Sequence, residues 1–528
     1  MTLAVNLTQP SSNPDFEGGP GSDSLMSTNA DASPEPSHAI MRRNVGMLAG
    51  GQILSWGMAA IWTLVVARAL GPAGFGLVVT ATSVTSIIGI ILSLGSTTYL
   101  TRDLVRHRES RPQIVGTAIV LKLSLVPVVA LVTVLFLRVA HYGHEARIVV
   151  LYASAMTAFI ALTTAPQAAF QALERMEYMA YSNVIANTGQ TVVGIIFVLI
   201  GLGAEGVMAS MALMAGVALL LNAWWLRRHI RIDLRTRLSA LVAMSRKSST
   251  FLAATLFATI YLWIDTVMLS MMTSSRVVGW YGAATTLFQT LLFLPSIIIT
   301  AWFPRLVAAF AEGRTELLRV ARAPLELTLV LCIPLATGTA MFAHLAVVVF
   351  YGHSFSRATP VMVALAVCIP PMSMNMVLAK VSQAGGQERI WAGLMIVAAF
   401  VNPAINLALI TLFQHLDHNG AIGAGWAMVA TEVVLDIVGL FVVGRHVLDG
   451  GALKRLALTF LASGGMLVAY HFATPLGQPV ALTAGVVAFF ALAFKLSVFN
   501  QEEMGLLFGL ATKLRMRINP RASMEPAA

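Results

Sequence analysis

Long apolar stretches follow one another along almost the whole chain, separated by short polar segments. A helix of about 20 apolar residues is long enough to span a bilayer. Fourteen stretches of that kind can be counted, over residues 45–67, 75–99, 113–137, 148–170, 181–202, 205–226, 249–272, 279–303, 324–350, 359–381, 390–413, 421–444, 456–473 and 478–498. The pattern predicts an all-α polytopic membrane protein with about 14 transmembrane helices.

The first twelve predicted spans divide into two halves of six with related connecting segments. The related pairs are VVARALGPAGFGLVV (65–79) with SSRVVGWYGAA (274–284), FQALERMEYMAYSN (170–183) with SQAGGQERIWAG (382–393), and GAEG (203–206) with GAIG (420–423). An even number of spans in each half gives both halves the same orientation, as in parallel repeats. We therefore predict two pseudo-symmetric six-helix lobes around a central cavity, with two additional C-terminal helices.

The predicted organisation has six parts along the chain. They are a disordered acidic cytoplasmic tail (1–40), an N-lobe (41–228), a basic cytoplasmic linker (229–248), a C-lobe (249–445), spans thirteen and fourteen (446–500) and a basic cytoplasmic tail (501–528). The first 40 residues are rich in Pro, Ser, Asn and Gly and carry acidic residues without Lys or Arg, a composition typical of disorder. They lack the basic and apolar regions of a signal peptide.

Composition and charge agree with a membrane location. Of the residues, 57% are hydrophobic and only 11% charged, whereas soluble domains carry about 25% charged residues. With the N-terminus placed in the cytoplasm, 28 of the 34 basic residues fall on the cytoplasmic side. The positive-inside rule then predicts that both termini are cytoplasmic. The net charge of +10 follows this topology, so we expect no nucleic-acid partner, and the two cysteines form no metal motif.

Five segments in order resemble the polysaccharide (O-antigen type) flippase family of the multidrug/oligosaccharidyl-lipid/polysaccharide exporter superfamily. The segments are RALGPAGFG with the following YLTRDLVRH, QALERMEYMAYSN, YLWIDTVMLSMM, VVGWYGAATTLFQTLLFLPSIIITAWFPRL and GGQERIWAG. The resemblance covers roughly residues 41 to 445. Spans thirteen and fourteen occur in many members of that family, whereas the acidic tail departs from its pattern.

The resemblance implies a function in surface polysaccharide synthesis. The protein would move an undecaprenyl-pyrophosphate-linked oligosaccharide across the bacterial inner membrane by alternating access. It would act beside membrane lipids and, in the pathway, beside a polysaccharide polymerase and glycosyltransferases. We expect no cofactor, and the sequence leaves open whether transport is coupled to protons, to sodium ions or to neither.

Two alternative functions remain open at the level of sequence. A cation-coupled multidrug antiporter would share the fold. A lipid-linked polysaccharide polymerase or ligase would be an enzyme, and such enzymes usually have a long external loop with catalytic Arg or His. No predicted external loop here exceeds about fifteen residues, and the chain has no Walker loop and no His-Glu-x-x-His motif. A membrane transporter is therefore the favoured interpretation.

Three basic residues are candidates for binding the pyrophosphate, because cations inside a membrane are costly and usually functional. Lys122 lies inside the third predicted span, where a cavity role competes with snorkelling or a structural pair. Arg68 ends the first span on the predicted external side, where it is either an interfacial anchor or a cation facing the cavity. Arg102 ends the second span on the predicted cytoplasmic side, as a gate or headgroup contact or as a solvated loop charge.

Acidic residues inside spans are candidates for the coupling ion. Asp265 has apolar neighbours and must pair with a cation, hold a proton or act as a structural hydrogen-bonding centre. Glu432 and Asp436 lie four residues apart on one helix face, in the cavity or in a structural role. A last set is predicted to form inter-lobe or helix-end ion pairs on the cytoplasmic face: Glu174, Arg175, Glu388 and Arg389.

Overall fold

The computed structural model describes residues 38–93, 97–444 and 447–499. By its internal contacts the chain divides into Met1–Gly46 and Met47–Ala528. Of the first unit, the described residues are only the beginning of one helix, and the predicted acidic tail and basic C-terminal tail lie outside the described residues. The description below concerns the second unit.

All regular structure in the described ranges is helical, as predicted. Thirteen helices are long and apolar enough to cross a membrane. The first predicted span and the larger part of the second lie within one helix, α1 (His38–Ile88), which turns at Gly71 where φ is +65°. Glycine adopts that left-handed conformation without the steric cost that a Cβ would bring. With α1 counted as two spans on either side of Gly71, the prediction of about fourteen spans is confirmed.

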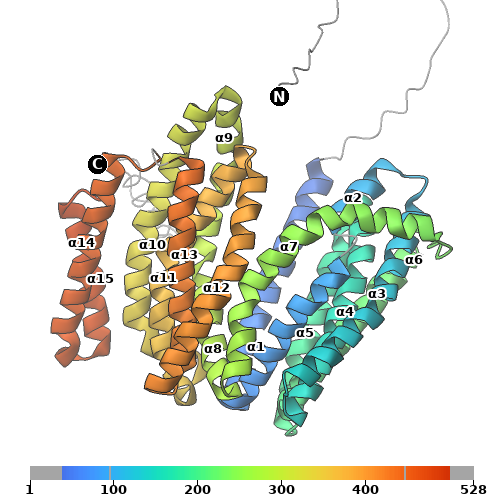
Figure 1. Cartoon of the computed structure of the whole chain (residues 1–528), viewed down its shortest axis with the longest axis horizontal. Coiled ribbons are helices and arrows are strands. Elements are labelled where there is room, and N and C mark those ends of the chain that lie inside the picture. Colours follow the sequence, from blue (N-terminus) through green and yellow to red (C-terminus); the bar gives the residue numbers. More distant parts are fainter. Residues whose placement is uncertain (1–37, 94–96, 445–446, 500–528) are drawn as a thin grey trace, which may run out of the picture. The chain divides into compact units, whose positions relative to one another are not determined.

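The N-lobe is a bundle of helices that lie side by side (Figure 1). Its elements after α1 are η1 (Gly89–Ser93), α2 (Thr97–Arg106), α3 (Arg111–Val139), α4 (His144–Ala172), α5 (Met176–Leu199) and α6 (Gly203–Arg227). Helix α4 packs against α2, α3 and α6. Helices α4 and α5 each pack along α6 but have few contacts with each other.

The C-lobe repeats this arrangement. Its elements are α7 (Leu238–Met272), α8 (Ser275–Leu291), α9 (Phe293–Glu312), α10 (Arg314–Tyr351), η2 (His353–Ala358), α11 (Thr359–Ala384), α12 (Glu388–Asp417) and α13 (Gly420–Val443). Helices α11 and α12 both pack along α13 and have few contacts with each other, as α4 and α5 do around α6. The hairpin of α14 (Gly450–Ala473), η4 (Thr474–Leu476) and α15 (Gln478–Lys495) packs mainly against α10.

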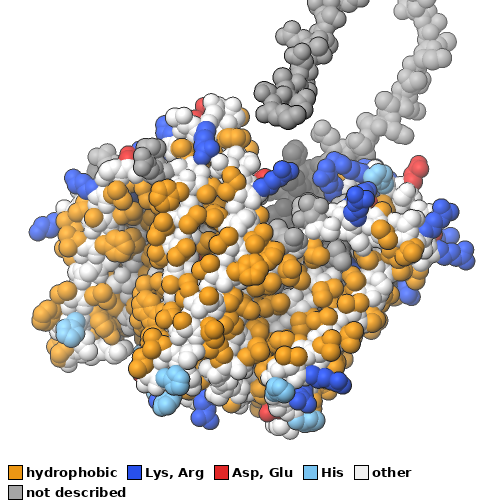
Figure 2. Space-filling view, viewed as in Figure 1, with side chains coloured by type: hydrophobic (Ala, Val, Ile, Leu, Met, Phe, Trp, Pro, Cys, Tyr) orange, Lys and Arg blue, Asp and Glu red, His pale blue; other side chains and the backbone are white. Residues whose placement is uncertain are grey.

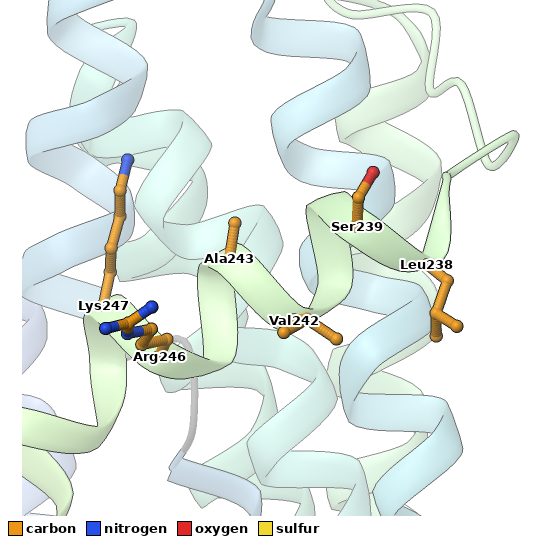
Figure 3. Close-up of a pocket in the computed structure, with 6 residues that line it drawn as sticks. All are labelled: Leu238, Ser239, Val242, Ala243, Arg246 and Lys247. Carbon is orange, nitrogen blue, oxygen red and sulfur yellow. The ribbon is translucent and has the colours of Figure 1, made fainter.

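Helix α7 begins inside the segment that was predicted to be a linker. Met244 and Leu241 pack into a core cluster of the N-lobe. Leu238 and Val242 point to one side of the helix and Ser239 to the other (Figure 3). Leu238 and Val242 are exposed, whereas Leu241 and Met244 share the face that packs on the N-lobe. Their spacing of three residues favours a helix rather than a loop. The helix therefore starts on the N-lobe and continues as the first span of the C-lobe, where it packs against α12.

The surface is that of a protein in lipid. Hydrophobic side chains cover the flanks of the helices, and Lys and Arg gather near the helix ends (Figure 2). Large exposed apolar residues include Leu131, Leu220 and Phe441. In water such a surface would be unfavourable, whereas in a bilayer it meets lipid tails. The chain is a multi-pass membrane protein.

Candidate functional site

The two turn motifs predicted to be counterparts contact each other across the lobes. A Cβ on Gly76 would lie 1.7 Å from the Ser275 carbonyl oxygen, and a Cβ on Gly279 would lie 1.9 Å from the Pro72 carbonyl oxygen. Only glycine permits the main chains to approach so closely. These contacts join the α1 turn to the start of α8, which closes the lobes against each other on the predicted external side.

Aromatic residues enlarge the same contact. The ring of Phe75 in the N-lobe lies 6.0 Å from that of Tyr351 and 6.1 Å from that of Phe355. All three rings are buried. Arg68 adds a polar contact, because its Nε donates to the Phe350 carbonyl at 3.1 Å and its Nη2 donates to the Val349 carbonyl. Arg68 thus binds the C-terminal end of α10, where unpaired carbonyls favour a cation.

Asp265 lies in a buried network of polar side chains inside the C-lobe. Its side chain accepts hydrogen bonds from the Asn406 Nδ2 at 2.7 Å and from the Tyr281 hydroxyl at 3.2 Å. The Asn406 amide also donates to the Asn402 Oδ1 at 2.8 Å, and the Asn402 Nδ2 donates to the Thr431 hydroxyl at 3.3 Å. Helices α7, α8 and α12 therefore meet at one carboxylate, and α13 joins the network through Thr431.

Glu432 forms a second centre of the same network, because α13 carries it next to Thr431. The Tyr261 hydroxyl donates to its Oε1 at 2.5 Å, and the Asn375 Nδ2 donates to its Oε2 at 2.7 Å. One turn further along α13, Asp436 is also buried, and its Oδ1 has no hydrogen-bond partner in the described part of the structure. The structure thus places the three predicted acids, Asp265, Glu432 and Asp436, within the C-lobe.

None of these three acids forms an ion pair with a Lys, Arg or His among the described residues. A buried carboxylate without a cation must take up a proton or bind a metal cation, because an isolated charge is too costly there. Carboxylate, amide and hydroxyl oxygens are ligands that hard cations prefer. No group of three or more His, Cys, Asp or Glu side chains among the described residues is placed to hold a metal ion. Exchange of a proton or a small cation at these acids therefore stays a prediction.

Lys122 is buried in the N-lobe with 2% of its side chain exposed. Its Nζ donates to the Leu92 carbonyl at 2.7 Å, in the 3₁₀ segment η1 that follows α1. A helix end leaves carbonyls without intrahelical partners, and the lysine supplies one. This contact agrees with the structural alternative for Lys122, while its binding of pyrophosphate stays a prediction.

The remaining predicted residues lie near helix ends. Arg102 is exposed on α2. The Arg175 Nη1 lies 3.3 Å from the Glu177 Oε1, which is a local ion pair at the start of α5. Glu388 is in the first turn of α12 and is followed by Arg389, while Glu174 takes a left-handed backbone conformation before α5.

The amides of the network were not among the predicted site residues. Asn375, Asn402 and Asn406 complete it together with Tyr261 and Tyr281. A signal was present in the sequence, because Asn402 and Asn406 are polar residues four apart within an apolar span. That spacing places both on one helix face and marks that face as buried in protein rather than exposed to lipid.

The comparisons with known proteins agree with this architecture. A family model described as "Polysaccharide biosynthesis protein" matches residues 41–310, which is just over half of the chain. The chain belongs to this family. No curated protein sequence matches the chain.

Two solved structures show the same fold. A lipid II flippase, MurJ, in an inward closed conformation superposes with a TM-score of 0.68 at 12% identity, over 84% of this chain and 97% of that one. An inward-facing multidrug resistance MATE family transporter of the MOP superfamily superposes with a TM-score of 0.58 at 18% identity, over 75% of this chain and 94% of that one. This member of the polysaccharide biosynthesis family therefore has the fold of membrane transporters and flippases.

Proposed function

We propose that the protein is a flippase that moves a polyprenyl-pyrophosphate-linked oligosaccharide, carried on undecaprenol, across the bacterial inner membrane. The observation that carries the proposal is the match to the polysaccharide biosynthesis family on a fold shared with a lipid II flippase. A lipid-linked sugar and lipid II share a polyprenyl pyrophosphate and a polar glycan, so the same two-lobe scaffold suits both.

Alternating access requires lobes that can close on one side and separate. The contacts of Gly76 with Ser275 and of Gly279 with Pro72 close the predicted external side in this structure. The interface between the lobes at this turn has few side-chain hydrogen bonds. The clearest are those that Arg68 donates to the carbonyls of Phe350 and Val349. Such an interface can open without leaving many buried polar groups unpaired.

The energy for transport would come from an ion bound in the C-lobe. Asp265, Glu432 and Asp436 have no basic partner among the described residues, which supports exchange of a proton or sodium ion. Binding of a cation would favour one arrangement of α7 against α12, because both helices contribute to the network. The ion can shift the lobes only by its difference in affinity between the two arrangements.

Deletion of the gene tests the substrate. We expect lipid-linked oligosaccharides to accumulate in the cytoplasmic leaflet, as measured by their resistance to a glycan-modifying reagent added outside spheroplasts. A wild-type copy of the gene should restore modification of the lipid-linked oligosaccharides by the external reagent. Modification at the wild-type level in the deletion strain would contradict the proposal.

A multidrug antiporter is the second candidate, because a MATE transporter shares the fold. Increased drug sensitivity of the deletion strain with unchanged surface polysaccharide would favour it. A polymerase or ligase has less support, because both compared structures are of a flippase or a transporter.

A further inference from the structure

The N-lobe contains a polar cavity that is separate from every residue discussed so far. It lies between α4 and α5 with α6 as its floor and has a volume of about 300 Å³. That volume is at the lower end of the range for small-molecule sites. Its polar lining consists of hydroxyl and amide groups and has no charged residue: Thr163, Thr164, Gln167, Ser182, Asn183, Asn187 and Gln190.

The sequence folds so that two polar stripes face this cavity. On α5, Asn183, Asn187 and Gln190 follow an i, i+4, i+7 spacing and so share one face. On α4, Thr163 and Gln167 are also four residues apart. Because both helices pack on α6 and have few contacts with each other, their polar faces are held apart rather than joined.

Small residues keep the cavity open. Its floor and wall include Ala186 of α5 and Ala215 and Ala218 of α6. Gly189 keeps α5 close to α6, since a Cβ there would lie 2.2 Å from the Met214 Cε. The Met214 side chain thus occupies the space beside Gly189, next to the cavity.

The amides that line the cavity have no side-chain hydrogen-bond partner in the described part of the chain. The side chains of Gln167, Asn183, Asn187 and Gln190 form no hydrogen bond with another described residue. By contrast, Asn222 on α6 is buried and donates to the Ser182 hydroxyl and the Ala218 carbonyl. Asn183 is exposed, and Gln167, Asn187 and Gln190 are partly buried, so their amide groups remain open to a ligand that enters the cavity.

We propose that this cavity binds one uncharged sugar residue of the glycan carried by the lipid. Side-chain amides both donate and accept hydrogen bonds, which matches the paired donor and acceptor character of a sugar hydroxyl. The absence of charged side chains from the lining disfavours pyrophosphate, whose two anionic groups need cations or many donors. In this proposal the glycan binds in the N-lobe, away from the network of acidic residues in the C-lobe.

This inference rests on the proposed flippase function, and a binding experiment separates the two. The purified protein in lipid nanodiscs is titrated with undecaprenyl pyrophosphate without sugar, and with the same lipid carrying one N-acetylglucosamine, glucose or galactose. We expect at least one sugar-bearing lipid to bind more tightly than the bare lipid.

The test variant is the double substitution Asn187→Leu and Gln190→Leu. We expect it to bind that sugar-bearing lipid about 5- to 100-fold more weakly, as for the loss of two hydrogen bonds, with bare-lipid binding unchanged. The matched control is Thr188→Val, which removes a hydroxyl from the same helix outside the cavity lining. Unchanged bare-lipid binding also shows that the variant is folded.

A second variant covers the case in which the double substitution fails to fold. Ala186→Leu fills the cavity without removing a polar group and should cause the same selective loss. A wild type without any sugar preference, or variants that keep it, overturns the inference while leaving the flippase function intact. If neither the bare nor the sugar-bearing lipids bind the wild type, the proposed function itself fails.

Discussion

The two lobes place different chemistry at equivalent positions of the same helical scaffold. In the C-lobe, the region around α11, α12 and α13 holds Asp265, Glu432 and Asp436 in a network of amides and phenols. In the N-lobe, the region around α4, α5 and α6 is an open cavity lined by uncharged groups. The described residues thus place buried carboxylates in one lobe and an uncharged polar lining in the other.

A single position illustrates how the difference arises. Gly203 and Gly206 lie 217 positions before Gly420 and Gly423, and the same offset pairs Ala215 with Glu432. At this position the N-lobe has the methyl side chain of Ala215, whereas the C-lobe has the larger carboxylate side chain of Glu432. Helix packing can thus be retained while one substitution changes the kind of ligand that the space accepts.

The strongest way to break the comparison is Asp265→Asn. We expect transport to fall by roughly 5- to 150-fold and to lose its dependence on a proton or sodium gradient, since coupling free energies are about 1–3 kcal/mol. Flipping of lipid-linked sugar in proteoliposomes, with and without each gradient, measures both. Asp417→Asn, at the exposed end of α12, is the matched control and should transport normally. Gradient-dependent transport by Asp265→Asn would show that the C-lobe network is structural.

Ala215→Glu sharpens the comparison by giving the N-lobe the residue of the C-lobe. A carboxylate in a membrane span costs about 2.5–3.5 kcal/mol without a partner. Because Ala215 lines the cavity, the new side chain would occupy the space of the sugar. In titrations we therefore expect sugar-bearing lipids to bind no more tightly than the bare lipid. Ala215→Ser, which is polar but uncharged, serves as the control and should retain the tighter binding of sugar-bearing lipids. Equal binding by both variants would mean that the neutral character of the cavity is irrelevant.

The contact between the lobes can be tested with Gly76→Ala. Its Cβ would overlap the Ser275 carbonyl, so the closed external side should lose about 1–3 kcal/mol. Single cysteines placed near Thr273 should then react faster with a membrane-impermeant maleimide. Gly464→Ala, where a Cβ meets nothing within 4 Å, is the control and should leave the rate unchanged. An unchanged rate for Gly76→Ala would indicate that the lobes do not separate at this turn.

Lys122→Met distinguishes a structural lysine from a substrate-binding one. Loss of the hydrogen bond to Leu92 should cost about 1–3 kcal/mol, because a buried carbonyl is left unpaired. A lower melting temperature with proportionate loss of transport supports the structural role. Loss of binding to bare undecaprenyl pyrophosphate at an unchanged melting temperature would instead support the predicted pyrophosphate site.

The smallest effect is expected at Asp449, a carboxylate outside the membrane spans. Its Oδ1 accepts a hydrogen bond from the Ala452 amide at 2.8 Å, and its Oδ2 pairs with Arg322. The Ala452 amide, aided by the Arg322 guanidinium, holds the pKa of the Asp449 carboxyl below its usual value. A carboxyl whose pKa is lower in the folded than in the unfolded protein stabilises the fold at pH values above its unfolded-state pKa. This stabilisation is lost as the pH falls through the folded-state pKa.

Asp449→Ala should therefore lower the melting temperature slightly at neutral pH and not at strongly acidic pH. Thermal unfolding of the two proteins at several pH values in the same detergent measures the difference. A difference that persists at acidic pH would show that Asp449 acts by packing rather than by charge. This exposed acid has both a helix end and an arginine to stabilise its charge, whereas the acids of the C-lobe network have neither.

Much of the fold could be predicted because its determinants are local. The length of each apolar stretch and the placement of Gly71 and Pro72 depend on residues adjacent in sequence. The start of α7 at Leu238 was missed, because a short amphipathic helix among basic residues resembles a charged loop. The two turn motifs were recognised as counterparts, but their contact with each other was not.

The sequence by itself determined the membrane location, the number of spans, the family and which acids lie inside the spans. Tertiary structure decided what those acids meet, since Asp265 and Asn406 are 141 positions apart and Lys122 and Leu92 are 30 apart. Tertiary structure alone also brought the amides of α4 and α5 to one cavity. The physical reason is that apolar length and periodicity select each helix separately, whereas the partner of a buried polar group depends on how whole helices pack.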